Sequence, residues 1–223
     1  PTVERMYRKY IAIISDADTK KVTEELYHVD VNALFPTIEA IFGKVYSILP
    51  DDIAIGDQIE IPLGDLGTFT ATVQMVKDDK VLFLFDDYIV KRPMNENGSN
   101  EGGYEKSDLK KWIENDLFKM FPKALRKHMT GLTIPTLGEI CGLGDNWDKE
   151  HIEPDGDEQL PLMKQRRNRV AYYNNECSSG WLRNAMKKEF SSAYFAAVGS
   201  YGNPSYGNAS DSFGVRPEFW LVR

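Results

Sequence analysis

The C-terminal part of the chain, from Tyr172 onward, constrains the fold most, because it combines a polar composition with strongly apolar segments. Asn, Ser, Tyr and Gly fill more than half of the positions from 172 to 214, and such a composition alone indicates disorder. Three apolar segments interrupt it, each typical of a buried strand: Trp181–Arg183, Ala193–Val198 and Val215–Val222. We therefore predict a folded surface whose loops present tyrosines and short hydrogen-bonding side chains, as binding surfaces do.

The totals limit the class of protein. With 223 residues, of which 42% are hydrophobic, the chain is long enough to bury a full core. Its net charge of −7 argues against a nucleic-acid partner, because phosphate binding normally needs a basic face. No apolar run reaches the length of a membrane span. Cys141 and Cys177 fit no zinc or redox spacing, so two reduced, buried thiols are the favoured interpretation.

The order of the expected elements predicts an α+β fold. Residues 1–55 differ from the rest and are interpreted as a small N-terminal arm or subdomain, with residues 56–223 as the main domain. Strands come first, helices lie in the middle, and strands return at the end, which favours α+β over alternating βαβ units. Strands are expected at Gln58–Pro62, Thr68–Val76 and Lys80–Phe85, a flexible loop at Asn95–Gly103, and helices at Asp108–Phe121 and Leu137–Cys141, capped by Ser107 and Thr136.

Several motifs occur in a recognisable order. They are Tyr104, Ser107, Leu109 and Trp112 at the start of the first helix, then Trp181–Arg183, Ala196–Gly202 and Gly214–Leu221. This order resembles a family of bacterial and phage domains with a C-type-lectin-like fold. Formylglycine-generating enzymes and the variable proteins of diversity-generating retroelements share that fold. The resemblance covers roughly residues 55–223 and implies short antiparallel sheets with two or more helices.

The resemblance also implies a function. In the retroelement proteins, copying errors at adenines vary Asn and Tyr codons on a rigid scaffold, and the segment 172–214 resembles such a variable region. This implies a non-enzymatic protein on a phage particle or bacterial surface that recognises a protein or glycan on another cell. The N-terminal arm would then serve oligomerisation, including homo-oligomerisation, or docking. A phage or cell-envelope structural protein of the same fold is the alternative. An oxidase of the formylglycine-generating type is disfavoured, because neither cysteine lies in a matching motif.

The candidate contact residues follow from side-chain chemistry. Tyrosine gives a large contact area at low entropic cost, and asparagine both donates and accepts hydrogen bonds. The predicted ligand contacts are Tyr172, Tyr173, Asn174, Asn175, Asn184, Tyr194, Ser200, Tyr201, Asn203, Ser205, Tyr206 and Asn208.

A second set is predicted to be structural rather than ligand-binding. Its members lie inside apolar strand motifs: Trp181, Arg183, Gly214, Arg216 and Trp220. The arginines are expected to bridge backbone carbonyls and buried carboxylates, because a planar guanidinium suits that task. The tryptophans are expected in the core.

A metal site was considered in the acidic loop Asp145–Glu158, since clustered oxygen ligands suit calcium. Its Glu153-Pro154-Asp155 echoes the Glu-Pro-Asn tripeptide of sugar-binding lectins, but the loop precedes the final strands instead of lying among them. A solvated acidic loop is favoured, and we expect no cofactor. The three histidines show no metal-ligand spacing, and no nucleophile motif is present, so we expect no enzymatic activity.

Overall fold

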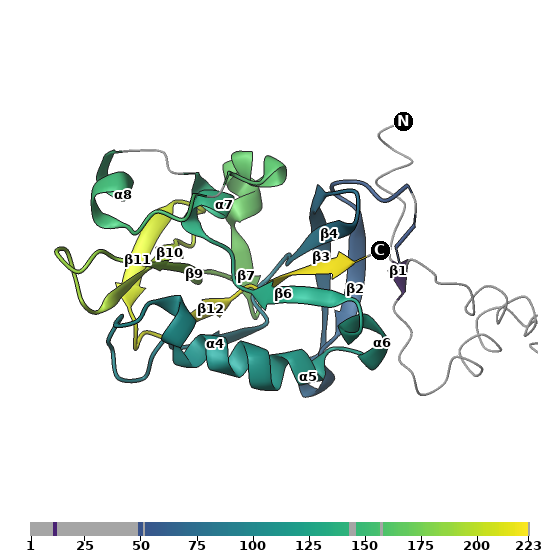
Figure 1. Ribbon diagram of the computed structural model, residues 1–223, viewed down its shortest axis with the longest axis horizontal. Coiled ribbons are helices and arrows are strands. Elements are labelled where there is room, and N and C mark those ends of the chain that lie inside the picture. The colour runs from purple at the N-terminus through teal and green to yellow at the C-terminus, as the bar shows by residue number, and fades with distance from the viewer. Residues whose placement is uncertain (1–10, 13–48, 51, 143–145, 157, 223) are drawn as a thin grey trace, which may run out of the picture.

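The computed structural model describes residues 11–12, 49–50, 52–142, 146–156 and 158–222. This part of the chain is an α+β structure dominated by strands, as the order of elements predicted (Figure 1). The predicted N-terminal arm, residues 1–55, lies almost entirely outside the described residues. No helix in the described ranges is both long and apolar enough to cross a lipid bilayer.

The first sheet joins the early strands to the last one. Its order is β1 (Ile11–Ala12), β2 (Gln58–Pro62), β3 (Thr68–Val76), β4 (Lys80–Phe85), β13 (Glu218–Val222) and β6 (Met129–Thr133). The β1–β2 pair is parallel and the other pairs are antiparallel. The strands predicted at 58–62, 68–76 and 80–85 are thus confirmed with the same bounds. A turn closed by the Lys77 N–H and the Lys80 carbonyl connects β3 to β4.

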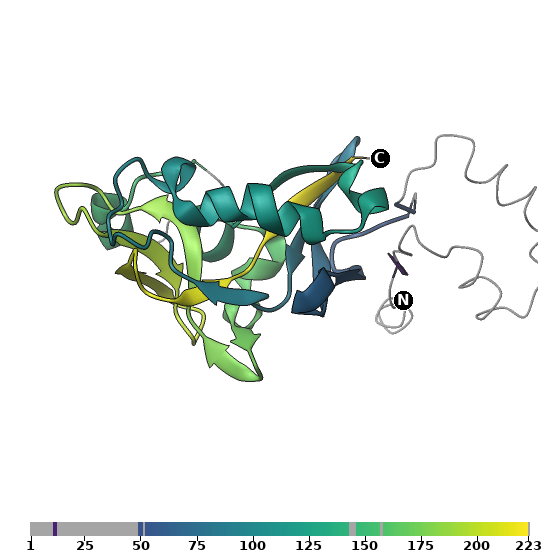
Figure 2. The same cartoon turned by 90° about the horizontal axis from the view of Figure 1, so that it is seen from below.

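The second sheet contains most of the C-terminal segment. Its order is β11 (Pro204–Asn208), β10 (Tyr194–Val198), β9 (Gly180–Ala185), β12 (Phe213–Val215) and β5 (Val90–Arg92). A separate ribbon, β7 (Ala171–Tyr173) and β8 (Glu176–Ser178), projects from the body of the molecule (Figure 2). Two of the three predicted apolar strands, at 181–183 and 193–198, therefore lie side by side as β9 and β10.

The third apolar segment, Val215–Val222, is not one strand as predicted but the junction of two. It ends β12 in the second sheet, passes through Arg216 and Pro217, and continues as β13 in the first sheet. Proline has no N–H for a strand ladder, so the pairing must break at Pro217. The Pro217 carbonyl accepts from the Phe85 N–H, which places the crossing directly beside the end of β4.

One long helical segment lies across both sheets (Figures 1 and 2). It consists of α4 (Asp108–Trp112), a π-helical turn η3 (Ile113–Leu117) and α5 (Phe118–Met120), and Pro122 ends it before α6 (Lys123–Arg126). The Ser107 side chain accepts from the Lys110 N–H, so the predicted N-cap is confirmed. Leu109, Ile113 and Leu117 are buried in a core shared with residues of both sheets.

A second core lies on the opposite face of the sheets. There α7 (Leu137–Cys141) and the turn η4 (Pro161–Lys164) cover residues of β4, β9 and β10. Thr136 and Glu139 form a complete capping box at the start of α7, which confirms the predicted cap. The remaining short elements are α8 (Asn146–His151), η1 (Gly64–Leu66), η2 (Tyr104–Lys106) and η5 (Arg166–Arg169). The sheets are therefore covered by helical segments on both faces.

The loop 95–103, predicted to be flexible, is anchored instead. The buried Asn100 side chain donates to the carbonyls of Met186, Ser191 and Tyr194 at 2.9–3.1 Å. The Asn95 side chain accepts from the Asp108 N–H at 2.8 Å. Asparagine satisfies backbone groups that no strand reaches, so this loop fixes the chain that leads into β10.

The glycine at the start of β9 is required by a close approach of Tyr88. A Cβ at Gly180 would overlap Cε1, Cζ and the hydroxyl of the buried Tyr88 ring. We expect Gly180→Ala to lower the free energy of unfolding by about 1–3 kcal/mol, typical of overpacking, in urea denaturation. In a Tyr88→Leu background, which lacks those three atoms, the same change should cost less than about 0.5 kcal/mol. An equal cost in both backgrounds would contradict this explanation.

Candidate functional site

The segment 172–214 separates into a buried scaffold and an exposed surface. Trp181, Phe195 and Ala197 are buried in the core, whereas Tyr201 and Tyr206 are 75% and 43% exposed. The inner strands β9 and β10 are largely buried on both faces, whereas the edge strand β11 and the β10–β11 turn are more exposed. The tyrosines are therefore held on a rigid support rather than on a free chain.

An exposed group of aromatic rings, here called the aromatic patch, lies on the β10–β11 hairpin and its approach. It consists of Tyr194, Tyr206, Phe190 and His151. The rings of Tyr194 and Tyr206 stack with centroids 5.5 Å apart, and Phe190 meets Tyr206 edge-on at 5.8 Å. His151, at the end of α8, contacts Phe190 at 4.8 Å. β11 is an edge strand of its sheet, so the patch is accessible from the side.

Two members of the aromatic patch were missed from the sequence. Phe190 is 37% exposed although it is a large apolar side chain, and it follows the charged run Lys187–Glu189. An aromatic residue in such a polar segment is a usable signal for a binding surface. His151 lies far away along the chain, and no pattern in the sequence connects it to the patch.

A second group of predicted contacts lies at one end of the second sheet. Val198 pairs with both Gly180 and Pro204, so the β10–β11 turn and the start of β9, which follows the ribbon, lie at the same end. Tyr201 is exposed at this turn, and its carbonyl accepts from the Arg166 side chain at 2.8 Å. Next to it are Ser200, which is half-buried, and Asn203, which is exposed.

The β7–β8 ribbon carries the predicted contacts Tyr172 to Asn175. Asn174 and Asn175 form its two-residue turn with φ angles of 52° and 65°, which asparagine tolerates better than most residues. Both are exposed, as is Tyr172. The half-buried Tyr173 ring lies 5.3 Å from the Lys91 ammonium.

Three residues predicted to contact a ligand have side chains that are buried, turned away from Tyr206 or bonded within a turn. Asn184 is buried and is corrected to a structural role, because it accepts from the Leu137 N–H and donates to Glu153 and Asp155. Ser205 pairs with Ala197, so it faces away from Tyr206. The Asn208 side chain accepts from Ser210, which closes the turn after β11.

Three of the residues predicted to be structural fix the scaffold. Buried Trp181 donates to the Arg92 carbonyl at 2.8 Å. A Cβ at Gly214 would overlap the Tyr88 ring. The buried Arg216 guanidinium donates to the carbonyl of Phe85 at 2.6 Å and to the carbonyl of Asn168. Arg216 thus bridges backbone carbonyls, as predicted for a structural arginine.

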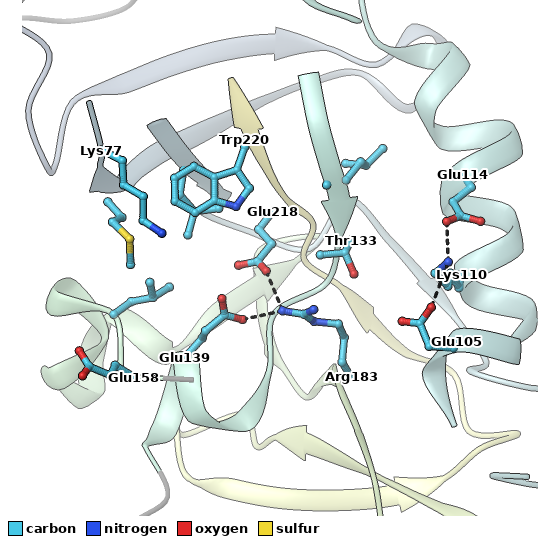
Figure 3. A pocket seen from close by; sticks show the side chains of 15 residues that line it. Lys77, Glu105, Lys110, Glu114, Thr133, Glu139, Glu158, Arg183, Glu218 and Trp220 are labelled. Atoms are coloured by element: carbon cyan, nitrogen blue, oxygen red, sulfur yellow. Dashed lines mark hydrogen bonds and ion pairs between the residues drawn. The ribbon is translucent and has the colours of Figure 1, made fainter. Parts of the chain in front are cut away.

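Arg183 and Trp220 line a cavity that the sequence did not indicate (Figure 3). Arg183 forms ion pairs with Glu139 at 3.0 Å and Glu218 at 3.3 Å. Trp220 is half-buried and borders this cavity instead of lying fully in the core, which corrects the prediction for it. The amino groups of Lys77 and Lys80 lie 4.9 and 4.6 Å from the centre of its ring.

The described part of the acidic segment 145–158 contains a short helix and hydrogen-bonds to α7 and β9. Residues 146–151 form α8, and the Asp155 carboxylate accepts from the Gly138 N–H and from Asn184. Within the residues that the structure describes, no group of three or more His, Cys, Asp or Glu side chains is arranged to hold a metal ion. Residues 145 and 157 lie outside that part, so the expectation of a solvated loop without calcium stays a prediction.

The two cysteines differ in environment, which corrects the expectation that both are buried. Cys177 is exposed on the ribbon, and Cys141 is half-buried at the end of α7. Burial raises the pKa of the Cys141 thiol to about 11. The thiolate is the reactive form, so Cys141 is a poor nucleophile at neutral pH.

We expect a thiol reagent such as 5,5′-dithiobis(2-nitrobenzoate), at about pH 8, to modify Cys177 at least about tenfold faster than Cys141. Absorbance should show one fast equivalent followed by one slow equivalent. Cys177→Ser should remove the fast phase alone, and Cys141→Ser the slow phase alone. A fast phase that survives Cys177→Ser would contradict the assigned environments.

Comparison with known proteins assigns no function. Residues 78–146 match the model of a domain family of unknown function, DUF6273. This stretch contains β4, β5 and the long helical segment, but no residue of the aromatic patch. No curated protein and no solved structure matches the chain.

Proposed function

We propose that this protein is a non-enzymatic recognition protein that binds a protein or glycan ligand through the aromatic patch and the adjoining β10–β11 turn. The observation that carries the proposal is the contact between Tyr194, Tyr206 and Phe190 at the open edge of a sheet. Grouped, partly exposed aromatic rings are unusual on a surface that binds nothing, and they provide large contact areas.

The rigidity of the support favours binding over a solvated loop. Asn100 fixes the carbonyls of Met186, Ser191 and Tyr194, on both sides of Phe190. β10 pairs with β11 along its whole length and with β9 on its other edge. A preformed surface loses little conformational entropy when it binds, so more of the contact energy contributes to affinity.

The proposal extends to the family suggested by the sequence motifs. We propose that the domain is C-type-lectin-like and that a diversity-generating retroelement varies the segment 172–214. Support comes from the division within this segment: Tyr201, Asn203 and Tyr206 are exposed, whereas the interleaved Trp181 and Leu182 are buried. Substitution at the exposed positions would change the surface and leave the core intact.

The same proposal places the protein on a phage particle or bacterial surface, with its ligand on another cell. The N-terminal region would then dock or oligomerise the domain, and linked copies would compensate for weak single sites.

We expect Tyr206→Ser to weaken ligand binding at least about tenfold, because truncating a central aromatic contact typically costs more than 1 kcal/mol. Binding would be measured on a glycan array and, by flow cytometry, on a panel of intact bacterial cells. Ile55→Ser is the matched control, since Ile55 is 44% exposed and Tyr206 43%, and Ile55 precedes β2 of the other sheet. Equal binding by the two variants would argue against the aromatic patch as the contact surface.

The retroelement part of the proposal has its own test at the level of the gene. We expect sequencing of many isolates to find substitutions concentrated at adenine-containing codons of exposed positions between 172 and 214. A near-identical template copy should lie near the gene. Trp and Phe codons contain no adenine, so those of buried Trp181 and Phe195 serve as the internal control and should stay constant. An invariant segment with no template copy would leave a fixed recognition domain.

A further inference from the structure

A cavity of about 470 Å³ lies beside β13, and its chemistry differs from that of the aromatic patch. It is lined by residues of β3, β4, β6, β9 and β13 and of the helical segments on both sides (Figure 3). Its volume is within the range of sites for small organic molecules. The proposed recognition function does not depend on this cavity.

The charges in this cavity are organised as two triads in which one cation serves two carboxylates. In the inner triad, Arg183 holds Glu139 and Glu218, whose side chains are largely buried. In the outer triad, Lys110 holds Glu114 at 2.6 Å and Glu105 at 3.3 Å, both well exposed. Each triad therefore has a net formal charge of −1.

The remaining lining does not cancel this excess. Glu158 and Lys77 offset one another formally, so the five carboxylates and three cations of the wall leave two uncompensated negative charges. Both Arg183 and Lys110 are already engaged by carboxylates, so an anion would have to displace an existing ion pair. A cation would instead relieve the repulsion between neighbouring carboxylates.

The opposite side of the cavity carries apolar side chains beside the charged Lys77 and Glu158 (Figure 3). Met75, Leu82 and Leu160 line it together with the Trp220 ring. That ring already attracts two ammonium groups of the protein itself, those of Lys77 and Lys80. Among aromatic rings, an indole attracts a cation most strongly to its π face. The contact of Lys77 with Trp220 shows such an attraction inside the cavity, and this observation does not depend on the carboxylate triads.

We propose that this cavity binds a small organic cation, with an ammonium group among the carboxylates and an apolar body against Trp220 and Leu160. The ligand class is a primary amine with an aromatic or alkyl body. The excess of negative charge favours an ammonium group, and the apolar side chains beside Trp220 favour an aromatic or alkyl body.

A matched set of three probes tests the proposal: 2-phenylethylamine, 2-phenylethanol and 3-phenylpropanoate, which share a body and differ in charge. Titrations into ¹⁵N-labelled protein would follow the Trp220 indole N–H, assigned by its loss in Trp220→Phe. We expect the amine to shift this signal and to bind at least about tenfold more tightly than the alcohol, with no shift from the propanoate. An alcohol that binds as tightly as the amine would overturn the proposal, as would an unmoved Trp220 signal.

Variants of the outer triad then test the role of charge without disturbing the core. Glu105 and Glu114 are exposed, so the double variant Glu105→Gln/Glu114→Gln should fold normally, and its Lys110 would repel the amine. We expect the amine affinity to fall at least about fivefold and the alcohol affinity to stay unchanged. Glu60→Gln/Glu176→Gln, which removes two exposed carboxylates outside the cavity, is the control. Unchanged amine binding in the first double variant would refute the charge argument.

Discussion

The crossing of the chain at Arg216 and Pro217 is the constraint on which the two sheets depend. Residues on one side of it complete β12, and residues on the other side begin β13. The Arg216 side chain donates to the Phe85 carbonyl at 2.6 Å, so it ties the crossing to the end of β4. Burial lowers the pKa of this guanidinium, and the charges of nearby Asp86 and Asp87 act in the opposite direction. Burying a cation is costly unless its donors are hydrogen-bonded, and the carbonyls of Phe85 and Asn168 accept from this guanidinium.

The two candidate sites use this scaffold in different ways. The aromatic patch lies at the open edge of the second sheet, where β11 has a neighbour on one side only. The cavity lies beside β13, which is paired on both sides, and is lined by charged residues from several elements. The aromatic patch is therefore a candidate site for the surface of a macromolecule, and the cavity is a candidate site for a small charged molecule. Because Arg183 lies in β9 and Trp220 in β13, the cavity draws on both sheets.

The sequence predicted local structure well because local rules decide it. The three early strands follow from alternation or from short apolar runs, and the helix starts at Ser107 and Thr136 follow from capping. It failed where distant segments meet. Asn184 has the same composition signal as Asn203, but its side chain satisfies backbone groups of α7. The sequence predicted that Arg183 would bridge buried carboxylates, and Glu139 and Glu218 meet that prediction, but it could not name them. These partners, like the contact of His151 with Phe190, lie in segments that only the tertiary fold brings together.

The pairing of β4 with β13 also has a kinetic meaning. The bond between Arg216 and Phe85 joins residues 131 positions apart, so forming it closes a very long loop. Closing a loop of this length costs conformational entropy, and non-local contacts of this kind are associated with slower folding. The whole segment 172–214 lies inside the closed loop, whereas β4 and β13 lie outside that segment. Sequence changes on the exposed face of that segment would therefore alter neither of the two strands that make this long-range pairing.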